Sequence, residues 1–121
     1  MIIKLGGPPN EDVEENNRLI DAFEKTASGI KENLNSSKDM LKIYINKSHD
    51  TVWQQSNDWM KLDEDIKTTF NATEEQLAFL RTVFKKYSKK NKKVLTQEEL
   101  SGRAKQIDLL RKNLNLLQSE F

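Results

Sequence analysis

Few side chains in this sequence have the types and spacing that covalent or metal chemistry requires. His49 is the only histidine and there is no cysteine, so a zinc site or a Ser-His-Asp triad lacks its usual groups. The acids Asp63, Glu64 and Asp65 are consecutive, and consecutive helical residues point in different directions, so they do not converge on one metal ion. We interpret His49 as a solvated turn residue and the three acids as a solvated helix face.

Motifs of nucleotide and acyl chemistry are also missing from the sequence. It contains no G-x-S-x-G, no G-x-G-x-x-G and no Walker A loop, each of which would place a nucleophile or a set of backbone N–H groups at a defined position. The sequence therefore lacks the catalytic sets from which such active sites are assembled. We predict that the protein is not an enzyme and needs no cofactor and no metal.

The densest charge in the sequence is a run of lysines with no acid between Arg81 and Glu98. The run consists of Lys85, Lys86, Lys89, Lys90, Lys92 and Lys93. Lysines at the end of a helix complement its dipole, and they are also candidate contacts for phosphates, lipid headgroups or an acidic protein. No base-stacking aromatic residues alternate with them and the net charge is only +1, so we predict no nucleic-acid binding. We favour the dipole interpretation and keep an anionic partner as its alternative.

Length and composition define the class of protein. With 121 residues the chain is long enough for one modest domain. Charged residues make up 32% and hydrophobic residues 36%, which suits long helices with one buried and one solvated face. No segment has the roughly 18 consecutive apolar residues of a membrane span, and the opening apolar stretch is too short for a signal peptide. We expect this chain itself to be soluble, and the lack of cysteine is compatible with the cytosol.

The strongest pattern is an apolar stripe between residues 52 and 87. It contains Val52, Trp59, Ile66, Thr73, Leu80 and Tyr87, and beside them Leu62, Phe70, Leu77 and Phe84. Residues three, four and seven apart share one face of an α-helix, so we predict one helix from about 51 to 90, opened by a capping box of Thr51 and Gln54. Trp59 is expected at the centre of the buried stripe. We expect Trp53 and Met60 to widen it, with an exposed patch for a partner as the alternative.

Segments on either side are expected to cover this stripe. The first, over about 11–45, has the heptad Val13, Ile20, Ala27, Leu34 and Leu41, which keeps its phase across Gly29 and residues 35–37. The second, over about 97–121, has Leu100, Ile107, Leu114 and Phe121, and a capping box of Thr96 and Glu99 precedes it.

Two short turns join these three predicted helices. Short connections make consecutive helices antiparallel neighbours. For residues 10–121 we therefore predict an all-α, antiparallel up-down-up three-helix bundle whose central helix contacts both others. Residues 1–9 end in Gly6-Gly7-Pro8-Pro9, and we predict that they are a flexible leader.

This pattern resembles the N-terminal Habc domain of syntaxin-type SNAREs. The stretch from Leu95 to Ile107 is similar to the start of the third helix in the syntaxin-6 and syntaxin-10 group, where a Leu and a capping residue precede an acid, an aliphatic residue and a basic residue. The matching residues are Leu95, Thr96, Glu99, Leu100, Arg103 and Ile107. The turn before this stretch departs from the family, because it is lysine-rich where the family often has Asn-Pro.

The resemblance implies a non-catalytic regulatory domain that acts in vesicle trafficking between endosomes and the Golgi. Its partners would be tethering or sorting factors and SNARE helices, on the cytosolic face of those membranes. No SNARE motif with its central Gln and no C-terminal anchor follows in this sequence, so the resemblance implies a fragment cut before them, with membrane attachment only through the missing anchor. The alternatives are a helical adaptor unrelated to SNAREs and a basic-patch module that binds acidic lipids or phosphates.

Overall fold

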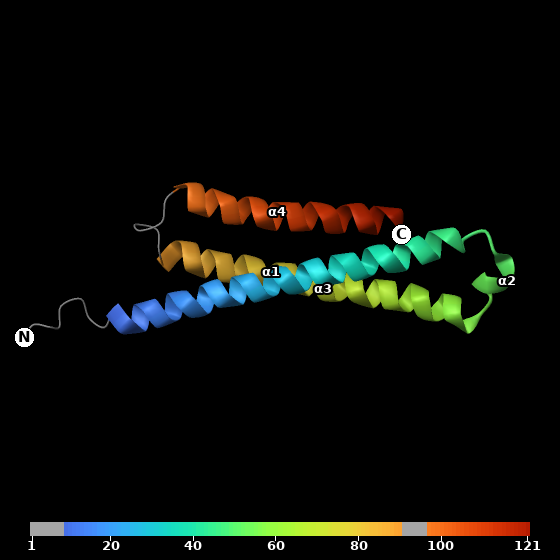
Figure 1. Ribbon diagram of the computed structural model, residues 1–121, viewed down its shortest axis with the longest axis horizontal. Coiled ribbons are helices and arrows are strands. Elements are labelled where there is room, and N and C mark those ends of the chain that lie inside the picture. The colour runs from blue at the N-terminus through green and yellow to red at the C-terminus, as the bar shows by residue number, and fades with distance from the viewer. Residues whose placement is uncertain (1–8, 91–96) are drawn as a thin grey trace, which may run out of the picture.

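The computed structural model describes residues 9–90 and 97–121, and in these two ranges the chain is all-α (Figure 1). The helices are α1 (Pro9–Asn46), α2 (Thr51–Gln54), α3 (Asn57–Lys90) and α4 (Gln97–Glu120). No strand occurs in the described part of the chain. Residues 1–8 of the predicted leader and residues 91–96, which include Lys92, Lys93 and Thr96, lie outside the described residues.

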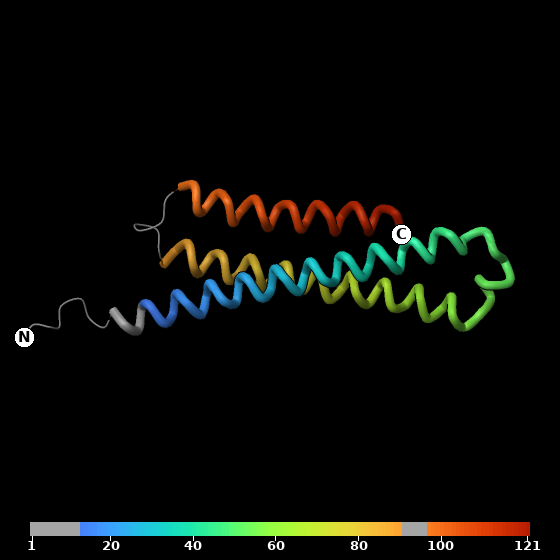
Figure 2. Tube along the Cα trace, viewed as in Figure 1, coloured from blue at the N-terminus to red at the C-terminus, as the bar shows by residue number. Residues whose placement is uncertain are grey.

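The three long helices lie side by side along the long axis of the molecule (Figures 1 and 2). α1 and α3 run in opposite directions, because Phe23 faces Phe84 with ring centroids 6.4 Å apart, whereas Tyr44 faces Trp59 at 4.1 Å. α4 runs in the direction of α1, and the ring of its following residue, Phe121, lies 4.9 Å from that of Tyr44. α1 and α3 continue past the end of α4, so only these two long helices reach the end of the molecule that holds α2 (Figure 2).

One apolar core runs between the long helices. Its members are Leu19, Phe23, Ala27, Ile30, Leu34 and Leu41 of α1, Ile66, Phe70, Leu77, Leu80, Val83 and Tyr87 of α3, and Ile107, Leu110 and Leu114 of α4. They recur every three or four residues, as amphipathic helices require, and each fully buried large side chain contributes roughly 1.5–3 kcal/mol relative to an exposed one. Val13 is exposed, so its predicted place in the stripe is wrong. Because Phe23 faces Phe84, Val13 lies beyond the end of α3.

The prediction of one helix from about 51 to 90 is wrong at its start. The chain forms the single turn α2 and then begins α3 at Asn57, because the Ser56 hydroxyl accepts a hydrogen bond from the Trp59 N–H at 3.2 Å and caps a new helix. The cap of α2 is Asp50 and not Thr51, since Asp50 Oδ1 accepts from the Trp53 N–H at 3.0 Å. This break removes the first predicted member of the stripe from the core, and Val52 is 80% exposed.

Polar groups interrupt the contact between α1 and α3 near its middle. Asn33 Nδ2 donates to Gln76 Oε1 over 2.7 Å, and a Cβ atom at position 29 would lie 3.1 Å from Gln76 Nε2. Glycine at position 29 therefore leaves room for this amide pair. Ser37 and Thr73 are fully buried, and Ser37 Oγ has no hydrogen-bond partner within the described ranges.

Candidate partner-binding surfaces

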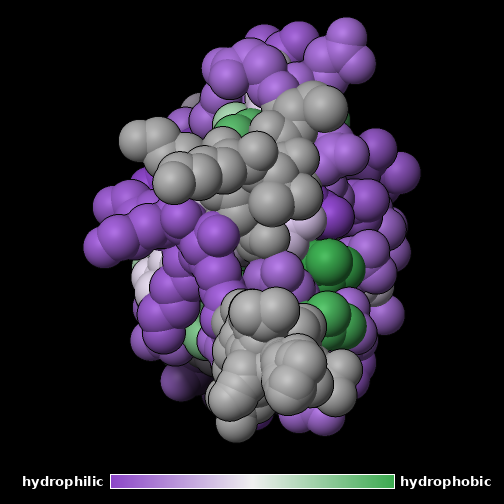
Figure 3. Space-filling view, turned by 90° about the vertical axis from the view of Figure 1, so that its left-hand side faces the viewer, coloured by the Kyte–Doolittle hydropathy of each residue, from purple (hydrophilic) through white to green (hydrophobic). Residues whose placement is uncertain are grey.

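The predicted lysine cluster lies at the C-terminal end of α3. Lys85, Lys86, Lys89 and Lys90 are all exposed, and Tyr87 between them is buried in the core. Figure 3 views this end of the molecule, and the described surface there is mostly hydrophilic. Lys89 and Lys90 occupy the last turn of α3, where a positive charge favours the helix dipole. The other two predicted members, Lys92 and Lys93, are not among the described residues.

A further cation near this end lies against the core. The Arg103 guanidinium of α4 is 4.9 Å from the centroid of the Phe23 ring and 5.3 Å from that of Tyr87. A cation over an aromatic face is attracted by the ring quadrupole, so Arg103 joins α4 to both α1 and α3. This role depends on how the three helices are aligned along their axes. The sequence alone does not define that alignment, so the role of Arg103 could not be predicted.

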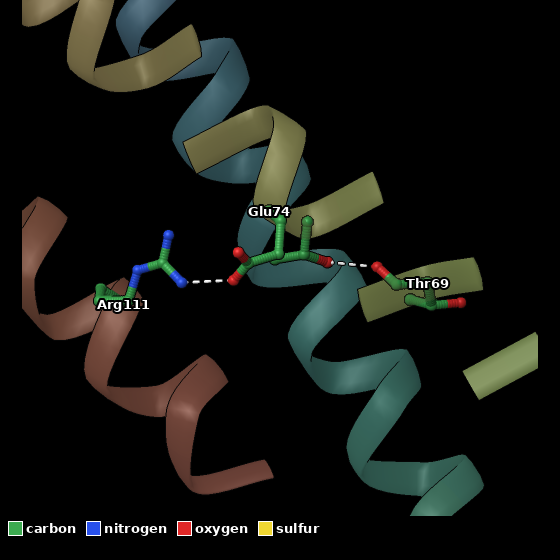
Figure 4. Close-up of polar contacts among 4 residues, drawn as sticks. Thr69, Glu74 and Arg111 are labelled. Carbon is green, nitrogen blue, oxygen red and sulfur yellow. Dashed lines mark hydrogen bonds and ion pairs between the residues drawn. The ribbon is translucent and has the colours of Figure 1, made fainter. Parts of the chain in front are cut away.

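α4 is also held to α3 by an ion pair. Arg111 Nη1 donates to Glu74 Oε1, and both side chains are partly buried (Figure 4). On the same part of α3 the buried Thr73 hydroxyl donates to the Thr69 carbonyl oxygen over 2.7 Å. The hydroxyl therefore has a partner within its own helix, and Thr73 packs as a core residue despite its polarity.

The opposite end of the molecule carries a cluster of aromatic side chains, which we call the aromatic cluster: Tyr44, Trp53, Trp59, Phe70 and Phe121. The Tyr44 and Trp59 rings are stacked at 4.1 Å, and Trp53 meets Trp59 edge-on at 5.2 Å. Phe121 continues the cluster toward Phe70, with ring centroids 5.9 Å apart. Offset and edge-on ring pairs are the favoured arrangements, so this cluster closes the α1–α3 pair where α4 ends.

The aromatic cluster is only partly covered. Trp59 is half-buried, not buried at the centre of the stripe as predicted. It lies in the first turn of α3, and α3 extends past the end of α4 (Figure 2). Met60 is 59% exposed, so the prediction that it widens the core is wrong, while Trp53 is half-buried. Ile43, Ile45 and Val52 are exposed in the same part of the chain. This end therefore presents large apolar side chains to solvent.

Asp63 and Lys67 hold the hydroxyl group of Tyr44, the tyrosine of the aromatic cluster, in place. The Tyr44 hydroxyl donates to Asp63 Oδ1 over 3.3 Å, and Lys67 Nζ lies 2.8 Å from Asp63 Oδ2. Burial and the Asp63 carboxylate raise the pKa of Tyr44, and the hydrogen bond to Asp63 raises the pKa of Lys67. The interpretation of Asp63 as part of a solvated face is wrong, whereas Glu64 and Asp65 are exposed.

A groove between α1 and α4 is the third surface feature. It has a volume of about 340 Å³ and is lined by Leu34 and Lys38 of α1 and by Asn113, Leu116, Leu117 and Glu120 of α4. The groove contains no histidine, and His49 is an exposed residue of the turn after α1. Within the described ranges, no three residues of the types His, Cys, Asp or Glu are grouped closely enough to hold a metal ion.

The fold and these surfaces define an all-α chain with exposed apolar and basic features on its helices. No known family model matches the sequence, and neither a curated protein nor a solved structure matches it. Among the described helices, none combines the length and the apolar character that crossing a bilayer demands.

Proposed function

We propose that this chain is a non-catalytic protein-binding domain, folded as an antiparallel up-down-up three-helix bundle, and that it is the N-terminal regulatory domain of a SNARE. The observation that carries the binding role is the exposed apolar side of the aromatic cluster. Trp, Tyr and Met are enriched at the centres of protein interfaces, and Trp53, Trp59 and Met60 lie together there with Tyr44.

The charges around the aromatic cluster favour a protein as the ligand. Lys47, Asp50, Asp58 and Lys61 are exposed around it and carry both signs. A mixed polar rim around an apolar centre is typical of protein interfaces, whereas a surface for anionic lipid or nucleic acid would be uniformly basic. The proposed partners are SNARE helices and tethering or sorting factors, and no cofactor is needed.

The SNARE assignment rests on the resemblance over residues 95–107. Two of the matching residues, Arg103 and Ile107, help to hold α4, because Arg103 lies over Phe23 and Tyr87 and Ile107 is buried. The similarity therefore coincides with positions that the packing of a third helix uses. By this assignment the protein acts between endosomes and the Golgi, on the cytosolic face of their membranes, to which a C-terminal anchor would attach it.

The test of the SNARE assignment is the transcript downstream of the codon for Phe121. We expect it to encode a heptad helix with a central Gln, followed by an apolar anchor. A stop codon directly after Phe121, or a downstream segment without that helix, would overturn the assignment. If that helix is encoded, the binding role is tested by adding it as a peptide to the isotope-labelled domain. We expect shifts of the indole N–H signals of Trp53 and Trp59, and Met60→Lys should reduce them while Val13→Lys, on the opposite end, should not.

A second candidate function is supported by the exposure of Lys85, Lys86, Lys89 and Lys90. Four exposed ammonium groups at one helix end suit an acidic lipid or phosphate. The test is co-sedimentation with vesicles that contain phosphatidylserine, at low and at high salt. Salt-sensitive binding that is lost when these lysines are changed to Glu would favour this function, and equal binding to neutral vesicles would exclude it. A helical adaptor unrelated to SNAREs remains the alternative if the downstream helix is absent but Met60→Lys still abolishes a protein contact.

A further inference from the structure

The outer face of α4 carries two leucines that the core does not use. Leu109 and Leu116 are 58% and 56% exposed, whereas Ile107, Leu110 and Leu114 of the same helix are buried. Leu109 and Leu116 are seven residues apart, so they lie on one line along the helix. This line lies outside the buried side of the helix, and Leu116 also borders the groove between α1 and α4.

Charged residues extend this line at both ends. Lys105 lies one turn before Leu109, and Glu120 lies one turn after Leu116, and both are exposed. Lys112 and Asn113, also exposed, lie midway between the two leucines. The order along the face is therefore Lys105, Leu109, a centre that holds Lys112 and Asn113, Leu116 and Glu120, so a positive charge ends the line on one side and a negative charge ends it on the other.

This order is complementary to itself when it is read in reverse. If a second α4 is placed antiparallel, with a two-fold axis midway between residues 112 and 113, Leu109 faces Leu116 of the second copy and Lys105 faces its Glu120. A parallel arrangement would instead bring Lys105 against Lys105 and Glu120 against Glu120, and opposed like charges disfavour pairing. The same surface patch on both copies is what a two-fold symmetric interface requires.

The groove beside this face provides a socket for a leucine of the second copy. Four residues of its lining, Asn113, Leu116, Leu117 and Glu120, have the spacing i, i+3, i+4 and i+7. Four residues with this spacing form the hole that receives a side chain in knobs-into-holes packing. In the antiparallel arrangement Leu109 of the second copy faces Leu116, one of the four residues around this hole, and Leu34 of α1 adds an apolar wall.

We propose that two copies of this chain associate through the outer faces of α4, antiparallel and with two-fold symmetry. The interaction uses a different surface from the aromatic cluster and does not depend on the proposed SNARE role. We favour a second copy as the occupant, because the charges at the two ends of this face complement each other in the antiparallel arrangement. The apolar contact is small, and the association is therefore concentration-dependent.

The test is sedimentation velocity of the whole chain over a range of concentrations. We expect a reversible monomer–dimer equilibrium. Lys105→Glu and Glu120→Lys should each weaken the dimer several-fold, and the double variant, which exchanges the two charges, should restore it. Leu109→Glu should weaken the dimer by about tenfold or more, whereas Phe79→Glu should not, because Phe79 is similarly exposed but lies on α3. Circular dichroism verifies that each variant remains helical.

A cross-linking experiment fixes the geometry of the dimer. The chain has no cysteine, so Asn113→Cys introduces one thiol close to the proposed two-fold axis, and oxidation should yield a disulfide-linked dimer. The matched control, Lys105→Cys, places the thiol far from its counterpart and should cross-link much more slowly. A chain that stays monomeric at all concentrations, a charge exchange that fails to restore association, or equal cross-linking at both positions would overturn the proposal.

Discussion

Replacing the buried Ser37 by alanine should make the protein more stable. Ser37 is fully buried in α1, and its hydroxyl oxygen has no hydrogen-bond partner in the part of the chain that the structure describes. A buried polar group without a partner costs about 1–3 kcal/mol, and alanine is the better helix former by a few tenths of a kcal/mol or more. We expect Ser37→Ala to raise the free energy of unfolding by roughly 1–2 kcal/mol. The small cavity that replaces the oxygen offsets part of the gain.

The assay is urea denaturation followed by circular dichroism, in which the midpoint should rise while the slope m stays constant. The neighbouring Ser36 is exposed, so Ser36→Ala has the same gain in helix propensity without the change in a buried group. The difference between the two variants therefore isolates the cost of the buried hydroxyl. Thr73→Val should change stability by less than Ser37→Ala, because the Thr73 hydroxyl donates to the Thr69 carbonyl. If Ser37→Ala gains no more than Ser36→Ala, the hydroxyl of Ser37 has a partner and the reasoning fails.

Three further predictions concern the aromatic contacts. Trp59→Ala should lower the free energy of unfolding by about 2 kcal/mol, less than for a fully buried ring, and Trp53→Ala by less, as urea denaturation would measure. The raised pKa values of Tyr44 and Lys67, ordinarily 10.0 and 10.5, make stability constant up to about pH 10 and lower as the pH rises through the folded-state values; denaturation at a series of alkaline pH values measures this. Arg103→Gln should lower the free energy of unfolding by about 1–2 kcal/mol, which a lower melting temperature would show.

Each of these predictions has an outcome that contradicts it. A neutral Trp59→Ala would mean that its stacking on Tyr44 contributes nothing. Both Tyr44 and Lys67 bind their protons more tightly in the folded state, so a free energy of unfolding that rises between pH 9 and pH 11 would contradict the prediction. The control is the double variant Tyr44→Phe and Lys67→Gln, in which the loss of stability at alkaline pH should be smaller. For Arg103, a comparable effect of Lys105→Gln, an exposed lysine of the same helix, would attribute the change to net charge and not to the contact.

The all-α class could be predicted because every long segment repeats its apolar residues at helical spacing. α1 runs unbroken through Gly29 and Ser37, since tertiary packing on α3 outweighs their low helix propensity. The break before Asn57 was not predicted, because the periodic pattern considers only the apolar residues. The Ser56 hydroxyl caps a new helix and interrupts the old one. Local capping competes with continuation of the helix, and the stripe alone does not decide between them.

The surfaces were predictable to different degrees. The lysine cluster is local in sequence, so the exposure of its four described members, which belong to the end of α3, follows directly from the pattern. The aromatic cluster combines Tyr44, Trp59 and Phe121 from three distant segments, and its exposure depends on where α4 ends relative to α1 and α3. Helical periodicity specifies the face of each residue but not the axial offset between helices, and for this reason Met60 was placed in the core.

The amide pair between Asn33 and Gln76 has a consequence for how the chain folds. The apolar residues of α1 and α3 repeat so regularly that sliding one helix along the other by two turns still buries leucine against leucine. A slip that sets Asn33 opposite Val83 and Gln76 opposite Met40 would leave both amides against apolar side chains, with their hydrogen bond unmade, and would separate Gly29 from the side chain that needs its space. We therefore expect a misaligned pair of α1 and α3 to be less stable than the native pair and to separate before the native alignment forms. We predict that this amide pair favours the native alignment during folding, and that Gln76→Leu adds a slow phase to refolding even where the final stability is unchanged.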